Sequence, residues 1–241
     1  MLVSLVLYGS RARGDHRQKS DVDLLGVIEE GPIHKELSAG GTSLYHYPHK
    51  LLLKNSSLGD LFVLHIVSEG IVLHDSLGAF KSVQDAFVFK ENYSKEICDA
   101  YIVIKFFEEN SHLLRKKDAR KRLVWAIRTV LIARCAERRK AYFSSDALAR
   151  ASKIGSLKRV IDNRNLPEFD ELLSVAIKIR ERFAQDCFPG SWPSMREDQR
   201  QLMKERGGLV ADTLKYSHPT RLLRLRNLTR ARAGLKQSDY C

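Results

Sequence analysis

The stretch GSRARGDHRQKSDVDLL, residues 9 to 25, decides how the rest of this chain is interpreted. The apolar run LVSLVLY at residues 2 to 8 precedes it, and a run of this length and composition predicts a buried strand. The segment VDLLGVI at residues 22 to 28 predicts a second strand. The polar, basic residues between the two therefore form a loop that joins two strands.

The start of this loop has the residue types that bind phosphate. Gly9 lets the backbone approach a phosphate closely, and Ser10 can cap a following helix or donate to a phosphate oxygen. Cationic side chains follow within ten residues: Arg11, Arg13, Arg17 and Lys19. The loop is therefore a candidate phosphate cradle.

The end of the loop has two carboxylates. Asp21 and Asp23 lie two residues apart on the predicted strand, so both side chains project to the same face. Neighbouring carboxylates repel each other, and a bound cation removes that repulsion. Mg²⁺ takes one or two carboxylates together with substrate phosphates, and a second metal ion can share such a site. A Gly-Ser followed ten residues later by Asp-x-Asp is expected by chance in well under about 1% of chains of this length.

This stretch resembles the signature of the DNA polymerase β-like nucleotidyltransferase superfamily. The similarity is to its minimal nucleotidyltransferase branch, which includes aminoglycoside nucleotidyltransferases of the kanamycin type and the antitoxins paired with HEPN toxins. It is close over residues 8 to 25 and looser as far as residue 75. The resemblance implies that Asp21 and Asp23 are catalytic and bind Mg²⁺.

The resemblance also implies the substrate and the residues that hold it. Gly9 and Ser10 would contact a nucleoside triphosphate, expected to be ATP, and Arg13 and Lys19 would help to hold its phosphates. The implied reaction moves a nucleoside monophosphate to a hydroxyl on a small molecule, a protein or an RNA.

Members of the superfamily usually supply a third carboxylate from a later strand. The matching strand here is predicted at residues 42 to 47, TSLYHY, and it contains no acid. Ser43 or His46 stands where the acid is expected, and Asp60 and Glu69, the nearest acids downstream, fall in a predicted helix. Three alternatives follow: the strand alignment differs, the base comes from elsewhere, with His46 as one candidate, or catalysis is weak.

The remaining pattern predicts an α+β fold. We expect a small mixed β-sheet nucleotidyltransferase domain with flanking helices over residues 1–85, followed by an α-helical bundle with a basic C-terminal segment over residues 86–241. Further elements are predicted from spacing and breaks: a helical stretch at 49–69, a strand at 71–75, and helices at 94–116, 118–140, 146–152, 168–186 and 194–206. The family usually has a helix before its first strand, whereas here the strand begins close to Met1.

The helical half resembles HEPN-like or substrate-binding bundles more weakly. HEPN ribonucleases use an arginine, four to six intervening residues and then a histidine, and no such pair occurs in this half. We therefore expect the bundle to shape the acceptor pocket or a homodimer interface.

The charge indicates anionic partners. The chain has 41 Lys and Arg against 29 Asp and Glu, a net charge of +12, which favours nucleotides or nucleic acids. From Arg221 the sequence RLLRLRNLTRARAGLKQ fits either a solvated basic helix or a nucleic-acid-binding tail, which would make this a DNA-binding protein, although no aromatic residue is present to stack on bases. An RNA or protein partner on this basic surface is therefore a further expectation.

The cysteines and the apolar runs indicate where in the cell the protein is expected. The four cysteines form no CxxC pair, and no signal peptide or apolar run of about 20 residues is present. We expect a cytoplasmic protein without a membrane partner. The alternative to an enzyme is a catalytically weak regulatory protein of a toxin-antitoxin or defence system that binds nucleotide or nucleic acid.

Overall fold

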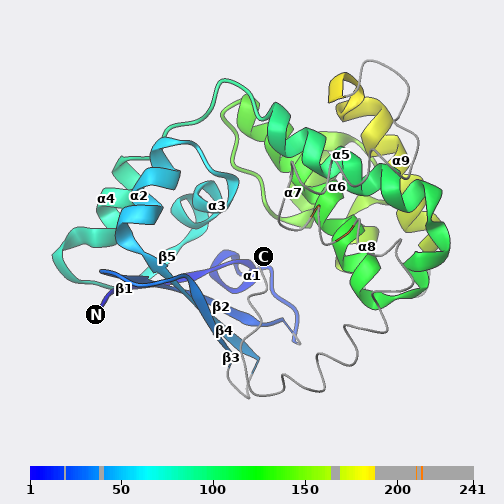
Figure 1. The fold of residues 1–241 in the computed structure, drawn as a ribbon. Helices are drawn as coiled ribbons and strands as arrows, with labels where there is room; N and C mark the ends of the chain where they lie inside the picture. Colours follow the sequence, from blue (N-terminus) through cyan, green and yellow to red (C-terminus); the bar gives the residue numbers. More distant parts are fainter. Residues whose placement is uncertain (19, 38–40, 164–168, 188–209, 211–212, 214–241) are drawn as a thin grey trace. The chain divides into compact units, whose positions relative to one another are not determined.

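The computed structural model describes residues 1–18, 20–37, 41–163, 169–187, 210 and 213 (Figure 1). Two compact units divide the chain: Met1–Asn92 with Cys135–Ser144, and Tyr93–Arg134 with the described residues from Ser145 onward. Lys19, the predicted helix at 194–206 and the basic segment from Arg221 lie outside the described residues.

The first unit is built on one mixed sheet. Its strands are β1 (Leu2–Tyr8), β2 (Val22–Ile28), β3 (His34–Leu37), β4 (Thr42–Pro48) and β5 (Ile71–Asp75), in the order β3-β4-β2-β1-β5. Strands β2 and β4 are parallel, and the other neighbouring pairs are antiparallel. The predictions of β1, β2, β4 and β5 are confirmed, and β4 extends one residue further than expected.

Strand β3 was not predicted, and its exposure explains why. All four of its residues are exposed, because it lies at the edge of the sheet. A strand with no buried face has no alternation of apolar and polar residues by which it can be recognised.

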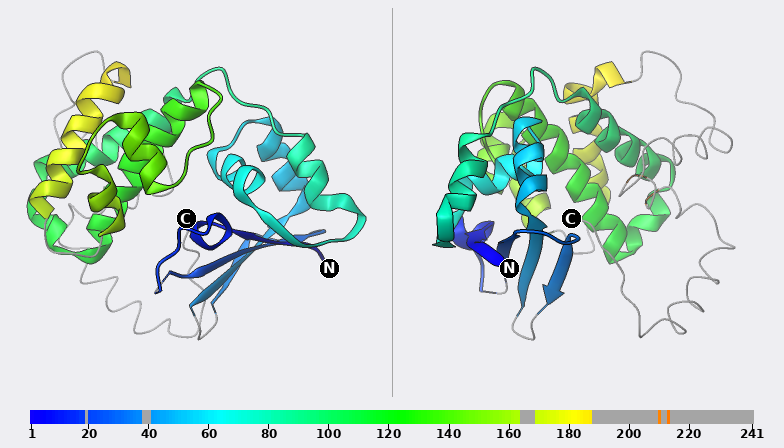
Figure 2. Two further views of the ribbon diagram at one scale, coloured as in Figure 1. Left: turned by 180° about the vertical axis from the view of Figure 1, so that it is seen from behind. Right: turned by 60° about the vertical axis from the view of Figure 1, so that its left-hand side comes forward.

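Helices cover one face of this sheet (Figures 1 and 2). They are α2 (His49–Ser57), α3 (Leu61–Glu69) and α4 (Ala79–Asp85), the last preceded by a 3-10 turn at Ser76–Gly78. The sheet and these helices enclose a core of fully or nearly buried side chains: Val3, Val6, Tyr8, Leu25, Val27, Leu52, Val63, Ile66, Ala79, Phe80 and Val83. The expected α+β class, a mixed sheet with flanking helices, is confirmed.

The single helical stretch expected over residues 49–69 is wrong, because two helices form there. Gly59 has a φ of +64°, and a Cβ at this position would lie 2.5 Å from the Val88 carbonyl oxygen. The carboxylate of Asp60 then caps α3 by accepting from the N–H groups of Phe62 and Val63, at 2.9 and 3.0 Å. Asp60 therefore starts a helix and does not lie inside one.

The second unit is helical. Its elements are α5 (Ser94–Glu109), a 3-10 turn at Ser111–Arg115, α6 (Lys117–Glu137, which crosses into the first unit at Cys135), α7 (Ser145–Ser152), α8 (Leu157–Asp162), α9 (Phe169–Phe183) and a 3-10 turn at Gln185–Cys187. Ile97, Tyr101, Ile104 and Phe107 are all buried, as their spacing predicted. The helix predicted to reach residue 116 ends earlier, because Asn110 leaves helical geometry and its side-chain amide donates to the Phe106 carbonyl oxygen.

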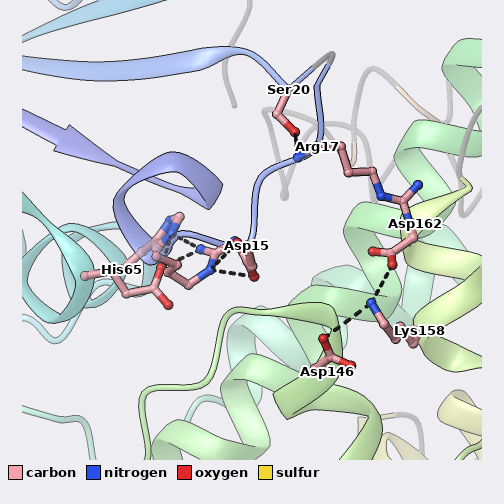
Figure 3. A network of polar contacts seen from close by, with 9 residues as sticks. Asp15, Arg17, Ser20, His65, Asp146, Lys158 and Asp162 are labelled. Carbon is pink, nitrogen blue, oxygen red and sulfur yellow. Dashed lines mark hydrogen bonds and ion pairs between the residues drawn. The ribbon is translucent and has the colours of Figure 1, made fainter.

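The short helix α8 was not predicted. An ion-pair bridge links it to α7: Lys158 lies 3.3 Å from Asp146 and 2.8 Å from Asp162 (Figure 3). The side chains of Leu157, Val160 and Ile161 are buried in this unit.

Among the described residues, no single helix is long and apolar enough to cross a membrane. Helices α2 and α3 meet the criteria of length and composition only when counted together, with a bend of 103° between them, and core helices of globular proteins meet the same criteria.

Asp75 ties the edge strand β5 to the start of α4. Its carboxylate accepts hydrogen bonds from the buried Ser4 hydroxyl and from the backbone N–H groups of Phe80 and Lys81. Burial raises the pKa of Asp75, but these hydrogen bonds outweigh burial and hold it below its usual value of 3.8. The ionised carboxylate is therefore the form that stabilises the fold.

Replacing Asp75 with alanine should lower the free energy of unfolding by about 1 kcal/mol at neutral pH, because three hydrogen bonds to the carboxylate are lost. A carboxyl group whose pKa is lower in the folded than in the unfolded protein adds stability at pH values above the unfolded-state pKa. This stability is lost as the pH falls through the folded-state pKa. The difference between wild type and Asp75→Ala, measured by urea unfolding, should therefore shrink below about pH 4.

Asp85→Ala is the matched control, because Asp85 is exposed at the other end of α4, where its carboxylate pairs with Lys81. It should change the unfolding free energy by less than about 0.5 kcal/mol. Equal losses in the two variants, or a constant difference down to pH 3, would contradict the role of Asp75.

Candidate active site

The chain turns sharply at Gly9, between β1 and the short helix α1 (Ser10–Arg13). Gly9 has φ 77° and ψ −154°, a backbone conformation open essentially to glycine alone. A Cβ at this position would lie 3.0 Å from Oδ2 of Asp23. A side chain at residue 9 would therefore press on the Asp23 carboxylate and force it to move.

The register of the sheet explains this approach. Tyr8 is paired with Asp23 across β1 and β2, so the residue after Tyr8 passes directly over the aspartate. Asp23 lies on the face that α2, α3 and α4 cover, because Tyr8, its partner, packs edge-on against Phe62 and His65 of α3 at 6.0 and 5.6 Å between ring centroids.

Asp21 stands just before β2, beside a second glycine. Gly41 has a φ of +75°, its carbonyl oxygen accepts from the Val22 N–H at 3.0 Å, and a Cβ there would lie 3.6 Å from Oδ1 of Asp21. Asp21 is exposed, and no hydrogen bond or ion pair engages its carboxylate within the described residues. Asp23 is half-buried. The two carboxylates flank Val22, but Asp21 precedes the strand, so the shared face of the two side chains stays a prediction.

Arg11 fixes the loop that leads into Asp21. Its Nε and Nη2 groups donate to the Ser20 carbonyl oxygen at 3.3 and 2.9 Å. The Ser20 hydroxyl accepts from the Arg17 N–H at 2.9 Å, and the Ser20 N–H donates back to the Arg17 carbonyl oxygen (Figure 3). No local pattern indicates this role, because a cationic side chain in a basic loop has the same sequence context whether it binds phosphate or backbone.

Arg13 lies in a network of its own. Its Nη1 donates to Glu69 Oε2 at 2.6 Å, and its Nε lies 3.1 and 3.2 Å from the two oxygens of Asp15. Burial lowers the pKa of Arg13, but the hydrogen bonds to Glu69 and Asp15 produce a net rise, so the guanidinium stays charged. Arg13 thus ties the end of α1 to the end of α3.

His65 completes this network. Its Nε2 lies 2.9 Å from Glu69 Oε2 and 3.4 Å from Nη1 of Arg13. A guanidinium can only donate and a carboxylate can only accept, so Nε2 cannot hydrogen-bond to both; we assign the shorter contact as the hydrogen bond, with Nε2 as the donor to Glu69. The other side of the ring stacks on Phe143, with 4.4 Å between centroids. Glu69 therefore accepts from two side chains, those of Arg13 and His65, and holds both beside the end of α3.

The parallel pairing of β2 and β4 decides which residue stands at the position of the third carboxylate. Asp23 is paired with Ser43, and both project to the helix-covered face. Among the described residues of the first unit, no third carboxylate, histidine or cysteine joins Asp21 and Asp23 in a three-ligand group. The residue of β4 that stands beside Asp23 is therefore Ser43, which carries no carboxylate, and the match of β4 to the family's third-carboxylate strand stays a prediction.

The structure overturns the idea that His46 is the general base. His46 lies three residues after Ser43 and is paired with Gly26, so it projects to the opposite face of the sheet. Burial, and next the charge of His34, lower its pKa, while Glu36 opposes the shift.

The family model described as a nucleotidyltransferase domain matches residues 2–126. A solved nucleotidyltransferase-like protein from Exiguobacterium sibiricum is similar over 98% of this chain and 90% of its own, with 14% sequence identity and a TM-score of 0.32. No curated protein matches the chain.

Strand β1, the Gly9 turn and the two aspartates, one just before β2 and one within it, all lie in the matched stretch, so the class is that of nucleotidyltransferase domains. The chain belongs to the nucleotidyltransferase domain family. A domain of this family acts on a nucleoside triphosphate.

Replacing Gly9 with alanine should disable the site. The backbone conformation would cost about 1–3 kcal/mol of stability, and the new methyl group would displace the Asp23 carboxylate. We expect Gly9→Ala to weaken binding of Mg²⁺ and nucleotide at least about tenfold, measured by calorimetric titration.

Gly14→Ala is the matched control. Gly14 also has a positive φ, 76°, but a Cβ there would meet nothing within 4 Å. It should lose stability while keeping nucleotide affinity. Equal losses of affinity in both variants would show that backbone strain, and not contact with Asp23, explains the effect.

Proposed function

We propose that this protein is a Mg²⁺-dependent nucleotidyltransferase that moves a nucleoside monophosphate from ATP, or another nucleoside triphosphate, to a hydroxyl acceptor. The observation that carries the proposal is the approach of the Asp23 carboxylate to the Gly9 turn, which brings a metal ligand and a phosphate-binding turn together. In the reaction, the acceptor oxygen bonds to the α-phosphorus, the bond from that phosphorus to the bridging oxygen breaks, and pyrophosphate leaves.

The donor set suits Mg²⁺. Asp21 and Asp23 provide oxygen ligands from two carboxylates, and Mg²⁺ commonly takes one or two of these together with phosphate oxygens and water. Bound there, the ion would neutralise charge on the α-phosphate, and a second ion can share the same carboxylates. The open carboxylate of Asp21 is consistent with a ligand that arrives with the substrate.

The phosphates would lie along the turn after β1. Gly9 offers its backbone, and Ser10 offers its hydroxyl. Nε and Nη1 of Arg13 are engaged by Asp15 and Glu69, whereas Nη2 has no partner within the described residues. Nη2 is therefore the atom through which Arg13 would reach a phosphate. Lys19 remains a predicted phosphate ligand.

Ser43 favours a second candidate function. With serine beside Asp23, no carboxylate of β4 can accept the proton of the attacking hydroxyl or complete the metal site. A protein of this kind would bind nucleotide well and turn it over slowly, as a regulatory component of a toxin-antitoxin or defence system would. A protein or RNA would then be its partner, and a homodimer its assembly.

Labelled nucleoside triphosphates, Mg²⁺ and a panel of small-molecule, protein and RNA acceptors test the first proposal. Asp21→Asn and Asp23→Asn should each lower label transfer about 100-fold or more, because the metal clamp on the phosphates is lost. Asp85→Asn removes an exposed carboxylate on α4 and should leave transfer unchanged. Full transfer by the double variant Asp21→Asn/Asp23→Asn would refute the proposal.

Ser43→Asp separates the two functions. An added carboxylate beside Asp23 should raise turnover at least about tenfold if the missing acid limits the reaction, since a general base is worth about 10²- to 10⁴-fold. Ser43→Asn has the same size without the charge and should give no gain. A rise in both variants, or in neither while wild type turns over rapidly, would show that the third acid is not limiting.

A further inference from the structure

A cluster of potential metal ligands lies at the edge of the sheet, away from the two aspartates. His34 and Glu36 are two residues apart on β3, and His34 is paired with His46 on β4. By strand alternation all three side chains project to the same face, the face opposite Asp23 and Ser43. We propose that His34, Glu36 and His46 form a binding site for a divalent transition-metal ion of the Zn²⁺ type.

The spacing of the ligand atoms fits such an ion. Nε2 of His46 lies 3.2 Å, and Nε2 of His34 lies 3.6 Å, from Oε1 of Glu36. One ligand atom from each residue lies within 4.8 Å of the other two. Ligands of a tetrahedral Zn²⁺ ion with bonds near 2.0–2.1 Å are separated by about 3.3–3.5 Å, which is close to the distances from Glu36. The rings of His34 and His46 are stacked, with 4.2 Å between centroids and 8° between planes, so they must tilt toward a common point to bind one ion.

The ring of His34 is already oriented for ligation. Its Nδ1 lies 3.2 Å from the Pro32 carbonyl oxygen. A carbonyl oxygen can only accept, so Nδ1 bears the proton, and in the neutral ring Nε2 presents its lone pair toward Glu36. Metal-binding histidines commonly donate their other ring N–H to a backbone carbonyl in this way, which fixes the tautomer and the ring orientation.

His46 is the buried member of the cluster. Its side chain is 12% exposed, and neither ring nitrogen has a hydrogen bond of good geometry within the described residues. A Cβ at Gly26 would lie 3.0 Å from Nδ1 of His46, so the ring sits in a space that only glycine leaves open. A buried nitrogen without a hydrogen bond indicates a partner that is not part of the chain. A metal ion bonded to Nε2 would provide that partner for one of the two ring nitrogens.

The ligand types distinguish this site from the Asp21/Asp23 site. Two imidazoles and one carboxylate suit Zn²⁺ and its neighbours in the transition series, whereas Mg²⁺ prefers oxygen. The three residues leave a fourth position for water. Because β3 is an exposed edge strand of four residues, an ion bound here would cross-link it to β4.

The test uses the full-length, metal-stripped protein in excess Mg²⁺, which saturates oxygen-only sites. Zn²⁺ affinity is measured by competition with a chromogenic chelator, and Co²⁺ is titrated as a spectroscopic probe. Wild type should bind one ion whose Co²⁺ spectrum lacks the thiolate charge-transfer band that cysteine ligands produce. His34→Ala and Glu36→Gln, both at exposed side chains, should weaken binding of this ion at least about tenfold.

His74→Ala is the matched control, because His74 is exposed on β5 and belongs to no such group among the described residues. It should bind Zn²⁺ as wild type does, and Zn²⁺ should raise the melting temperature of wild type and His74→Ala but not of His34→Ala. The proposal is overturned if wild type binds no ion, if His34→Ala and Glu36→Gln bind as wild type does, if the spectrum shows thiolate ligation, or if His74→Ala loses the ion equally.

Discussion

The candidate site depends on one close approach, between the backbone of Gly9 and the carboxylate of Asp23. The antiparallel register that pairs Tyr8 with Asp23 forces the chain leaving β1 to pass over the aspartate, and only a residue without a side chain can do so in this conformation. The contact joins the turn that we propose binds phosphate to the aspartate that we propose binds the metal ion. A shift of one residue in the register of β1 and β2 would move the Asp23 side chain to the other face of the sheet and separate it from the Gly9 turn.

Two arginines of the basic loop maintain this geometry from opposite sides. Arg11 holds the Ser20 carbonyl oxygen next to Asp21, and Arg13 joins Glu69 at the end of α3. Two of the cationic side chains in the loop thus bind its own backbone and neighbouring carboxylates. A guanidinium serves this purpose well, because its several N–H donors lie in a fixed plane and can bind two partners at once.

The two groups of candidate metal ligands lie on opposite faces of the sheet. Asp23 and Ser43 project to the face that the helices cover, and His46 projects to the other. The two proposed sites, one with carboxylate ligands and one with two imidazoles, therefore share no residue. The proposed functions of the two sites can accordingly be tested apart, since a change at the edge strand β3 leaves the pairing of β1 with β2 intact.

The sequence by itself determined the α+β class, four of the five strands and the Gly-Ser and Asp-x-Asp motif, because these rest on local apolar runs and on residue spacing. The apolar pattern missed β3, because none of its residues is buried. The same pattern joined α2 to α3, because apolar residues at helical spacing continue across the bend at Gly59 and the cap at Asp60. The tertiary structure alone decided the partners of Arg13 and the face of His46. Those depend on contacts between residues far apart in the chain, which no local pattern records.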